Sequence, residues 1–247
     1  ETELSDQMSF TTPVNRLHSG FVDRNRDFLL RYRSLVYQHN WAKSRVRGFI
    51  GGRIALLPHQ LYVAGEVTHR DLSRVLLADE TGLGKTIEAC LILHRRLVSG
   101  SIERVLVLTP SSLVHQWFIE LYRKFNLFFR IFDDEYCRSL EDSDAKVNPF
   151  LDDQLALCSI DFLTRNPLRR QQAVAAGWDC VVIDEAHHLT ENSDNYALAV
   201  QISAICRQLI LLSATPEQLG QKSHFSRLHL LDSARYTDYH RFLQEER

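Results

Sequence analysis

The chain has no long apolar run, no strong excess of charge and no paired cysteine motif. Its apolar runs are as short as Leu209–Leu212, whereas a membrane-spanning helix needs about 20 apolar residues, so no span is expected. The formal net charge is -2, which excludes a strongly basic nucleic-acid coat but allows a local basic patch. The first ten residues are acidic and polar, which is not the pattern of a signal peptide.

The cysteines are few, and their spacing favours neither disulfides nor zinc. None forms a C-x-x-C pair, and their number, five, is odd. Most lie in apolar stretches, so we expect small buried residues and a reducing, cytoplasmic compartment. The histidines show no zinc-ligand spacing with cysteine, so no structural metal is expected. The cysteines are Cys90, Cys137, Cys158, Cys180 and Cys206.

The length of 247 residues suits one large domain, or one domain with an extension. The chain begins with Glu rather than Met, so we expect a fragment of a longer protein. We predict a basic helical extension over residues 1–50 and a body over residues 51–247, because glycines at 48, 51 and 52 interrupt the helical pattern. The apolar face of the extension's helix is predicted from residues at helical spacing: Phe28, Leu29, Tyr32, Leu35 and Val36.

Charge is unevenly distributed. Residues 16–53 hold nine Lys or Arg against two acids, and residues 133–153 hold eight acids against two bases. The basic helix could bind phosphate or an acidic partner, although a solvated arginine face is the default interpretation. The acidic stretch would repel nucleic acid, so we expect it away from any nucleic-acid path; it could contact a protein or form a loop.

Short apolar runs alternate with longer, helix-compatible segments along the body. Continuous apolar runs are typical of strands covered on both faces, as in a parallel sheet between helices. We therefore predict an α/β fold with at least five parallel strands, whose carboxyl-end loops form the ligand site. The predicted strands are Val75–Ala78, Val105–Thr109, Leu155–Ser159, Cys180–Ile183 and Leu209–Leu212.

A glycine-containing loop joins the first predicted strand to a helix that is expected to run from Lys85 to Leu97. Gly82 and Gly84 allow backbone to approach a ligand closely, and the start of the helix favours a phosphate. Lys85 can reach β/γ-phosphate oxygens, and the Thr86 hydroxyl can hold Mg²⁺. The P-loop pattern expects glycine where this chain has Asp79. A plain turn before a helix is the alternative.

Two carboxylates, Asp184 and Glu185, directly follow the apolar run Val181–Ile183. Carboxylates at the end of a buried strand are costly unless they meet a cation or face a cleft. Asp184 can orient Mg²⁺, and Glu185 can polarise an attacking water. A solvated turn that caps the next helix is the alternative, but Lys85 and Thr86 supply the other half of a magnesium–nucleotide site.

Three further sites are weaker. The Gln60 amide can donate and accept together, which matches the N6/N7 edge of adenine, although exposed glutamines are common.

Ser213 and Thr215 end a strand and could hydrogen-bond the acidic loop and report the nucleotide state. A plain turn is an equal alternative.

Thr109, Pro110 and Ser111 end another strand before a helix. Hydroxyl and N–H groups at a helix start suit a backbone phosphate of nucleic acid. The same serines could instead cap the helix.

Together the segments PHQ, DETGLGKT, LTPSSL, DEAH and SATP, in this order, resemble the first motor lobe of helicase superfamily two. DETGLGKT, with Asp79 in the glycine position, is similar to the Swi/Snf-type translocases. SATPEQLGQKSHFSRLHLLD and FVDRNRDFLLRYRSLVY resemble, within that family, the bacterial ATPases that associate with RNA polymerase. The resemblance covers the chain from about Phe21 onward.

The resemblance implies the first RecA-like lobe of a P-loop ATPase, with ATP and Mg²⁺ as cofactors. Gln60 would contact adenine, Asp184 would hold Mg²⁺, and Glu185 would hold water. The phosphate loop would comprise Asp79, Glu80, Thr81, Gly82, Leu83, Gly84, Lys85 and Thr86.

His187, Ser213 and Thr215 would couple hydrolysis to movement, by the same resemblance. Such motors translocate on duplex DNA, and this branch would bind RNA polymerase and promote its recycling in the bacterial cytoplasm. The family's second RecA-like lobe, which supplies arginines to the γ-phosphate, has no counterpart in the 31 residues that follow Pro216.

We therefore expect the fragment to bind nucleotide and to hydrolyse it slowly. The alternative is a protein-docking module for RNA polymerase with incidental nucleotide binding. A small nucleotide kinase or GTPase is a third interpretation, but it predicts a base-specifying loop and a second substrate site, and the sequence suggests neither.

Overall fold

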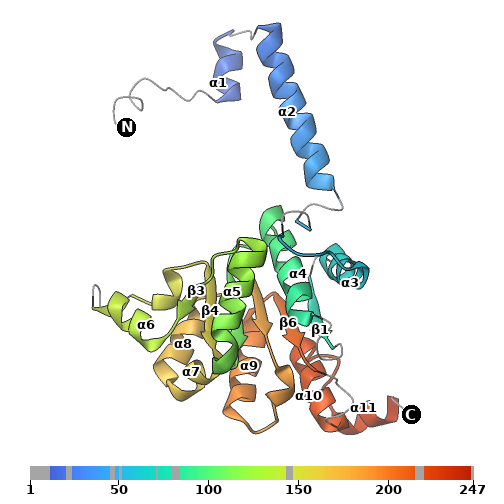
Figure 1. Ribbon diagram of the computed structural model, residues 1–247, viewed down its shortest axis with the longest axis vertical. Helices are drawn as coiled ribbons and strands as arrows, with labels where there is room; N and C mark the ends of the chain where they lie inside the picture. Colours follow the sequence, from blue (N-terminus) through green and yellow to red (C-terminus); the bar gives the residue numbers. More distant parts are fainter. Residues whose placement is uncertain are drawn as a thin grey trace. The chain divides into compact units, whose positions relative to one another are not determined.

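The computed structural model of the chain describes residues 12–20, 24–44, 48–49, 52–70, 72–78, 84–142, 147–214 and 220–245. It divides into two compact units, Glu1–Arg45 and Val46–Arg247 (Figure 1). The predicted division at residue 50 into extension and body stays a prediction. Phe49 is already buried in the larger unit, and its ring stacks under the guanidinium of Arg95 at 4.8 Å.

The smaller unit is helical. It contains α1 (Pro13–His18) and α2 (Asn25–Lys43), and Thr12 caps α1 by accepting a hydrogen bond from the Asn15 N–H. Large apolar side chains between Phe28 and Tyr37 on α2 are exposed, including Phe28 and Leu35 at 57% and 64%. The predicted helix is thus present, and these side chains are not covered within their own unit.

The larger unit is built on a six-stranded, all-parallel sheet of order β1-β6-β5-β2-β4-β3. Five of the strands confirm the predicted ones to within a residue at each end. The sixth, β3, was not predicted, because it is three residues long and lies at the sheet edge. The strands are β1 (Arg74–Leu77), β2 (Val105–Thr109), β3 (Arg130–Phe132), β4 (Leu155–Ser159), β5 (Cys180–Ile183) and β6 (Gln208–Leu212).

Helices connect the strands, because parallel neighbours need a crossover connection rather than a tight turn. The helix predicted after the first strand runs two residues beyond Leu97 and ends where Gly100 adopts a left-handed conformation with φ of 72°. The helices of this unit are α3 (Pro58–His69), α4 (Lys85–Ser99), α5 (Val114–Phe125), α6 (Asp134–Glu141), α7 (Ile160–Arg165), α8 (Pro167–Ala175), α9 (Asp194–Ile205), α10 (Gln221–Leu231) and α11 (Tyr239–Glu245), with short 3₁₀ turns at Ser111–Leu113, Pro149–Leu151 and Ala186–His188.

Both faces of the sheet are buried, because successive strand residues point to opposite sides. In β2, Val105 and Val107 pack with α3, α4 and α5, whereas Leu106 and Leu108 pack with helices α7 to α10. The result is a three-layer α/β/α sandwich (Figure 1), which confirms the predicted fold class. All five cysteines are buried free thiols, as the sequence predicted.

Part of the acidic stretch is neutralised within the fold. Arg169 on α8 is almost fully buried, and its guanidinium donates to both carboxylate oxygens of Glu141, one at 2.8 Å. Of the residues that the structure describes, no helix combines the length and apolar character needed to cross a bilayer.

Candidate nucleotide site

The first half of the candidate site is the start of α4. Gly84 precedes the helix with φ of 89°, a left-handed conformation that glycine adopts without a steric cost. No side chain in the described ranges caps this end of α4, whereas Ser159 and Ser193 cap α7 and α9. The positive end of the helix therefore favours an anion here. The predicted loop residues Asp79, Glu80, Thr81, Gly82 and Leu83 lie outside the described residues.

Gln60 lies against this turn. Its side chain is only 4% exposed, and a Cβ built on Gly84 would lie 2.5 Å from Nε2 of Gln60. The amide of Gln60, at the start of α3, therefore packs directly on the Gly84 backbone. The structure brings this predicted residue to the phosphate turn, where an added Cβ at position 84 would require the Gln60 amide to shift.

The second half is Asp184, at the carboxyl end of β5. One carboxylate oxygen, Oδ2, accepts a hydrogen bond from Nε1 of Trp117 at 2.7 Å, and Oδ1 accepts one from the Glu185 N–H at 2.8 Å. Burial raises the pKa of Asp184, while the two hydrogen bonds and the charge of Lys85 lower it. The carboxylate is thus oriented from two sides and has further lone pairs for a cation.

Glu185, the second carboxylate of the pair, lies against the imidazole of His187. Glu185 has φ of 50°, a left-handed backbone that is uncommon for a residue with a side chain. Its Oε2 lies 2.9 Å from Nδ1 of His187. Burial, together with the neighbouring ring of His188, lowers the pKa of His187, although the charge of Glu185 acts in the opposite direction. Strained backbone of this kind is concentrated at functional sites.

One cavity of about 360 Å³ joins the two halves. This volume is within the usual range for small-molecule sites. The described residues that line it are Gly84, Lys85, Thr86, Ile87, Leu113, Gln116, Trp117, Glu120, Lys124, Asp184 and Glu185.

These residues fit a magnesium–nucleotide. An ammonium group, a hydroxyl and an uncapped helix start suit phosphate, and a half-buried, oriented carboxylate suits a hard divalent cation. Gln60 packs on one side of the Gly84 turn, and Gly84 itself lines the same cavity.

Ser213 lies at the carboxyl end of β6 and is fully buried. Its N–H donates to the Leu77 carbonyl at 3.0 Å, and its hydroxyl donates to the Ala214 carbonyl at 3.2 Å. The predicted hydrogen bond to the acidic loop is not among the bonds of the described residues. Thr215 lies outside the described residues.

The predicted nucleic-acid segment follows β2. Thr109 is fully buried and donates to the Pro110 carbonyl at 3.0 Å, whereas Ser111 is exposed. Neither the 3₁₀ turn at Ser111 nor α5 has a side-chain cap, so the serines do not act as the caps that the sequence allowed. Pro110 borders a separate cavity of about 230 Å³ beside Asp184 and Glu185.

Trp117 is a site residue that the sequence did not predict. It lies in the apolar stripe of an amphipathic helix, where a tryptophan is normally core, and its ring is indeed 1% exposed. Only the fold shows that its single N–H donor reaches Asp184. A buried tryptophan needs a partner for that N–H, but the sequence does not say which.

The chain is similar in sequence to known proteins. The SNF2-related domain family matches residues 37–247. The RNA polymerase-associated protein RapA of Histophilus somni is 48% identical over 252 residues, covering 100% of this chain and 26% of that protein. The RapA protein of Vibrio atlanticus is likewise 48% identical over 251 residues, with the same coverage. The chain therefore spans about a quarter of the length of the curated relatives it matches.

Two solved structures share the fold. The Sulfolobus solfataricus SWI2/SNF2 ATPase core in complex with dsDNA has a TM-score of 0.65 and 20% identity, over 78% of this chain and 39% of that one. The Pyrococcus furiosus Hef helicase domain has a TM-score of 0.54 and 19% identity, over 70% of this chain and 35% of that one. At these identities the likeness is one of fold alone.

Proposed function

The chain belongs to the SNF2-related domain family, and from that membership and the cavity between Gly84 and Asp184 we propose that it is the first, ATP-binding lobe of a Swi/Snf-type DNA-dependent ATPase. The observation that carries the proposal is the single cavity bordered by the start of α4 and by the Asp184–Glu185 pair. These segments are about 100 residues apart in the chain, and together they present the groups that a magnesium–nucleotide needs.

Each residue has a proposed role. Lys85 holds phosphate oxygens, Thr86 and Asp184 hold Mg²⁺, and Gln60 contacts adenine from its place beside Gly84. When bound, Mg²⁺ neutralises charge on the phosphates. Glu185 orients the attacking water, and Nδ1 of His187 lies 2.9 Å from its carboxylate.

Coupling to movement would run through His187, Ser213 and Thr215. Duplex DNA would lie along the segment Thr109–Ser111, in the full motor rather than in this lobe alone. Because Thr109 is buried, Ser111 and the adjacent backbone would make the phosphate contact.

The larger assembly is proposed from the relatives. Their name, RNA polymerase-associated protein, supports RNA polymerase as the partner. Recycling of polymerase in the bacterial cytoplasm is the process that the sequence resemblance implies, and we propose it on that basis. Because the chain covers about a quarter of those proteins, a second RecA-like lobe would complete the ATP site in the longer chain. An arginine finger contributes roughly 10³–10⁵ in rate to phosphoryl-transfer enzymes, so this lobe alone would hydrolyse ATP slowly.

Calorimetric titration with Mg·ATP tests the site. We expect the chain to bind Mg·ATP and Lys85→Ala to bind it at least about tenfold more weakly. Lys222→Ala is the matched control, since Lys222 pairs with Glu191 outside this cavity. Equal affinity of the wild type and Lys85→Ala would contradict the proposed site.

A second candidate function is a docking module for RNA polymerase with incidental nucleotide binding. The exposed apolar side chains of α2, such as Phe28 and Leu35, favour it. Co-precipitation with RNA polymerase that survives Lys85→Ala but is lost on deletion of residues 1–50 would support docking over ATPase function.

A further inference from the structure

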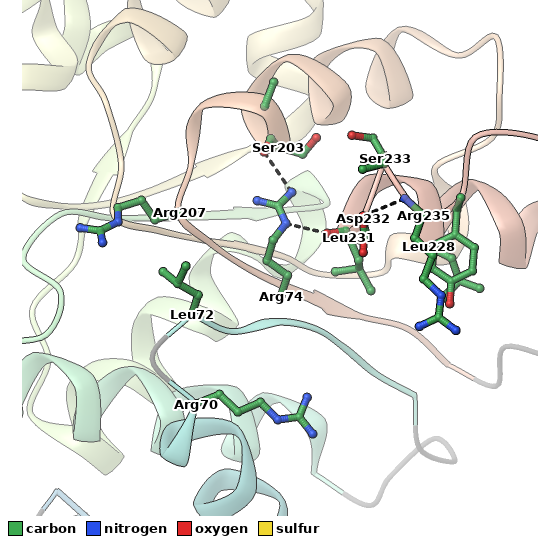
Figure 2. A pocket seen from close by; sticks show the side chains of 13 residues that line it. Arg70, Leu72, Arg74, Ser203, Arg207, Leu228, Leu231, Asp232, Ser233 and Arg235 are labelled. Carbon is green, nitrogen blue, oxygen red and sulfur yellow. Dashed lines mark hydrogen bonds between the residues drawn. The ribbon is translucent and has the colours of Figure 1, made fainter.

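An open cavity of about 630 Å³ lies at the amino-terminal ends of β1 and β6, the opposite end of these strands from Ser213 and the nucleotide site. Figure 2 shows Arg74 at its centre, with Arg207, Arg70 and Arg235 around it. Among the described residues that line the cavity are four arginines, one carboxylate, Asp232, and no lysine.

Arg74 has a structural role in the wall. Its guanidinium donates to four backbone carbonyls, those of Ser203, Cys206, Leu230 and Leu231, at 2.7–2.9 Å. These carbonyls end α9 and α10, where the helix dipoles favour a cation. Arg74 therefore fixes the two helix ends that frame the cavity.

The other three arginines are exposed. In the described part of the chain, no carboxylate forms an ion pair with Arg70, Arg207 or Arg235. The Arg235 guanidinium stacks over the Tyr236 ring at 5.3 Å. The one acid, Asp232, accepts a hydrogen bond from the backbone N–H of Arg235 at 3.0 Å rather than from a guanidinium.

Apolar side chains lie between these charges. Leu72 is 58% exposed, and Leu228, Leu231 and the ring of Tyr236 are partly exposed on the same cavity. A phosphodiester backbone would match the charges and leave these apolar groups uncovered. A polypeptide that carries both carboxylates and apolar side chains matches both.

We propose that this cavity is a docking site for an acidic polypeptide segment of another protein, which inserts an apolar side chain against Leu72 and Tyr236 and pairs its carboxylates with Arg70, Arg207 and Arg235. Arginine binds carboxylates through two parallel hydrogen bonds. Arginine and tyrosine are enriched at protein interfaces, whereas lysine is depleted there. The residues of this cavity follow that composition.

Fluorescence anisotropy of the full 247-residue chain tests the proposal with a labelled synthetic peptide of alternating Glu and Leu. We expect saturable binding, and no binding of the same peptide with Gln in place of Glu. A triple variant, Arg70→Gln/Arg207→Gln/Arg235→Gln, is expected to bind at least about threefold more weakly, since three exposed ion pairs are lost together. Arg123→Gln, which removes an exposed arginine outside the cavity, is expected to bind as the wild type does.

Leu72→Ser provides an independent variant, and we expect it to weaken peptide binding without a change in charge. A duplex DNA oligonucleotide serves as the competing probe. Failure of the wild type to bind the acidic peptide would overturn the proposal, as would unchanged peptide affinity in the triple variant. Loss of DNA binding in the triple variant, with peptide binding retained, would identify a nucleic-acid site instead. Neither result depends on Lys85, so the outcome is separate from that of the proposed ATP site.

Discussion

Trp117 and Asp184 are joined by a hydrogen bond of 2.7 Å between the indole Nε1 and the carboxylate Oδ2. The tryptophan comes from α5 and the aspartate from the end of β5, so the bond links a helix on one face of the sheet to the edge that forms the cavity. The indole has no other donor, and its ring is locked in the core. It therefore fixes the orientation of the carboxylate proposed to hold Mg²⁺.

We expect Trp117→Phe to weaken Mg·ATP binding about tenfold, because a hydrogen bond to a charged group contributes about 1.5–3 kcal/mol. Trp178→Phe is the matched control. It removes an indole N–H that donates at 2.8 Å to the Ala173 carbonyl, away from the nucleotide cavity. Calorimetry of both variants checks the prediction, and equal losses of affinity would show that the effect is one of general stability.

Gly84→Ala is expected to impair both stability and nucleotide binding. A left-handed conformation costs a residue with a Cβ about 1–2 kcal/mol, and the added Cβ would clash with the Gln60 amide. Gly100→Ala carries the same conformational cost with φ of 72°, but its Cβ would meet nothing within 4 Å. We therefore expect the left-handed backbone to cause a similar loss of thermal stability in both variants. A loss of Mg·ATP affinity is expected only in Gly84→Ala. Retention of full affinity in that variant would argue against a tightly packed turn.

The Glu141–Arg169 pair predicts a pH dependence of stability. Hydrogen bonds from Arg169 and Gln172 lower the pKa of Glu141 from 4.5 to about 2. A carboxylate whose pKa is lower in the folded state stabilises above the unfolded value, and that contribution is lost as pH falls from about 4.5 toward 2.

We expect Glu141→Gln to lower the free energy of unfolding by about 2 kcal/mol at pH 7, and by less at pH 3. Urea unfolding at the two pH values measures the difference. Glu135→Gln, an exposed carboxylate on the same helix, should change little at either pH. A loss that does not shrink at low pH would contradict the assignment to the ion pair.

Arg74 should contribute more to stability than Arg207, which lines the same cavity. Arg74→Met leaves four carbonyls at the ends of α9 and α10 without their donor, so we expect a loss of at least about 3 kcal/mol. Arg74→Lys should recover only part of it, because an ammonium cannot match the planar fork of guanidinium donors. Arg207→Met, on the same cavity, is expected to stay within about 0.5 kcal/mol of the wild type. Chemical denaturation of the three variants checks this order.

The sequence predicted the central strands because they are buried on both faces and hence continuously apolar. It did not predict β3, since Arg130–Phe132 is too short and too polar at its start for that signal. The phosphate turn and the Asp184–Glu185 pair were predicted because their residue types and spacing reflect local chemistry. Their meeting at one cavity depends on strand order, which local pattern does not specify.

Other features depend wholly on tertiary structure. The bond from Trp117 and the packing of Gln60 on Gly84 join segments that are distant in the chain. The arginine-lined cavity combines residues from three separate stretches, none of which is unusually basic by itself. The left-handed backbone at Glu185 has no signal in the sequence, because the residue type does not favour it.

The strand order has a geometric consequence for any motion that starts at the nucleotide. β6 lies between β1 and β5, so the strand that arrives last along the chain is the immediate neighbour of both strands that lead into the binding cavity. Adjacent strands are about 4.8 Å apart. The carboxyl ends of β1 and β5, which lead into the two halves of the site, are therefore about 10 Å apart, and Ser213 at the end of β6 lies between them. A change in the separation of β1 and β5 must strain or relax β6 first. From β6 the chain continues toward α10.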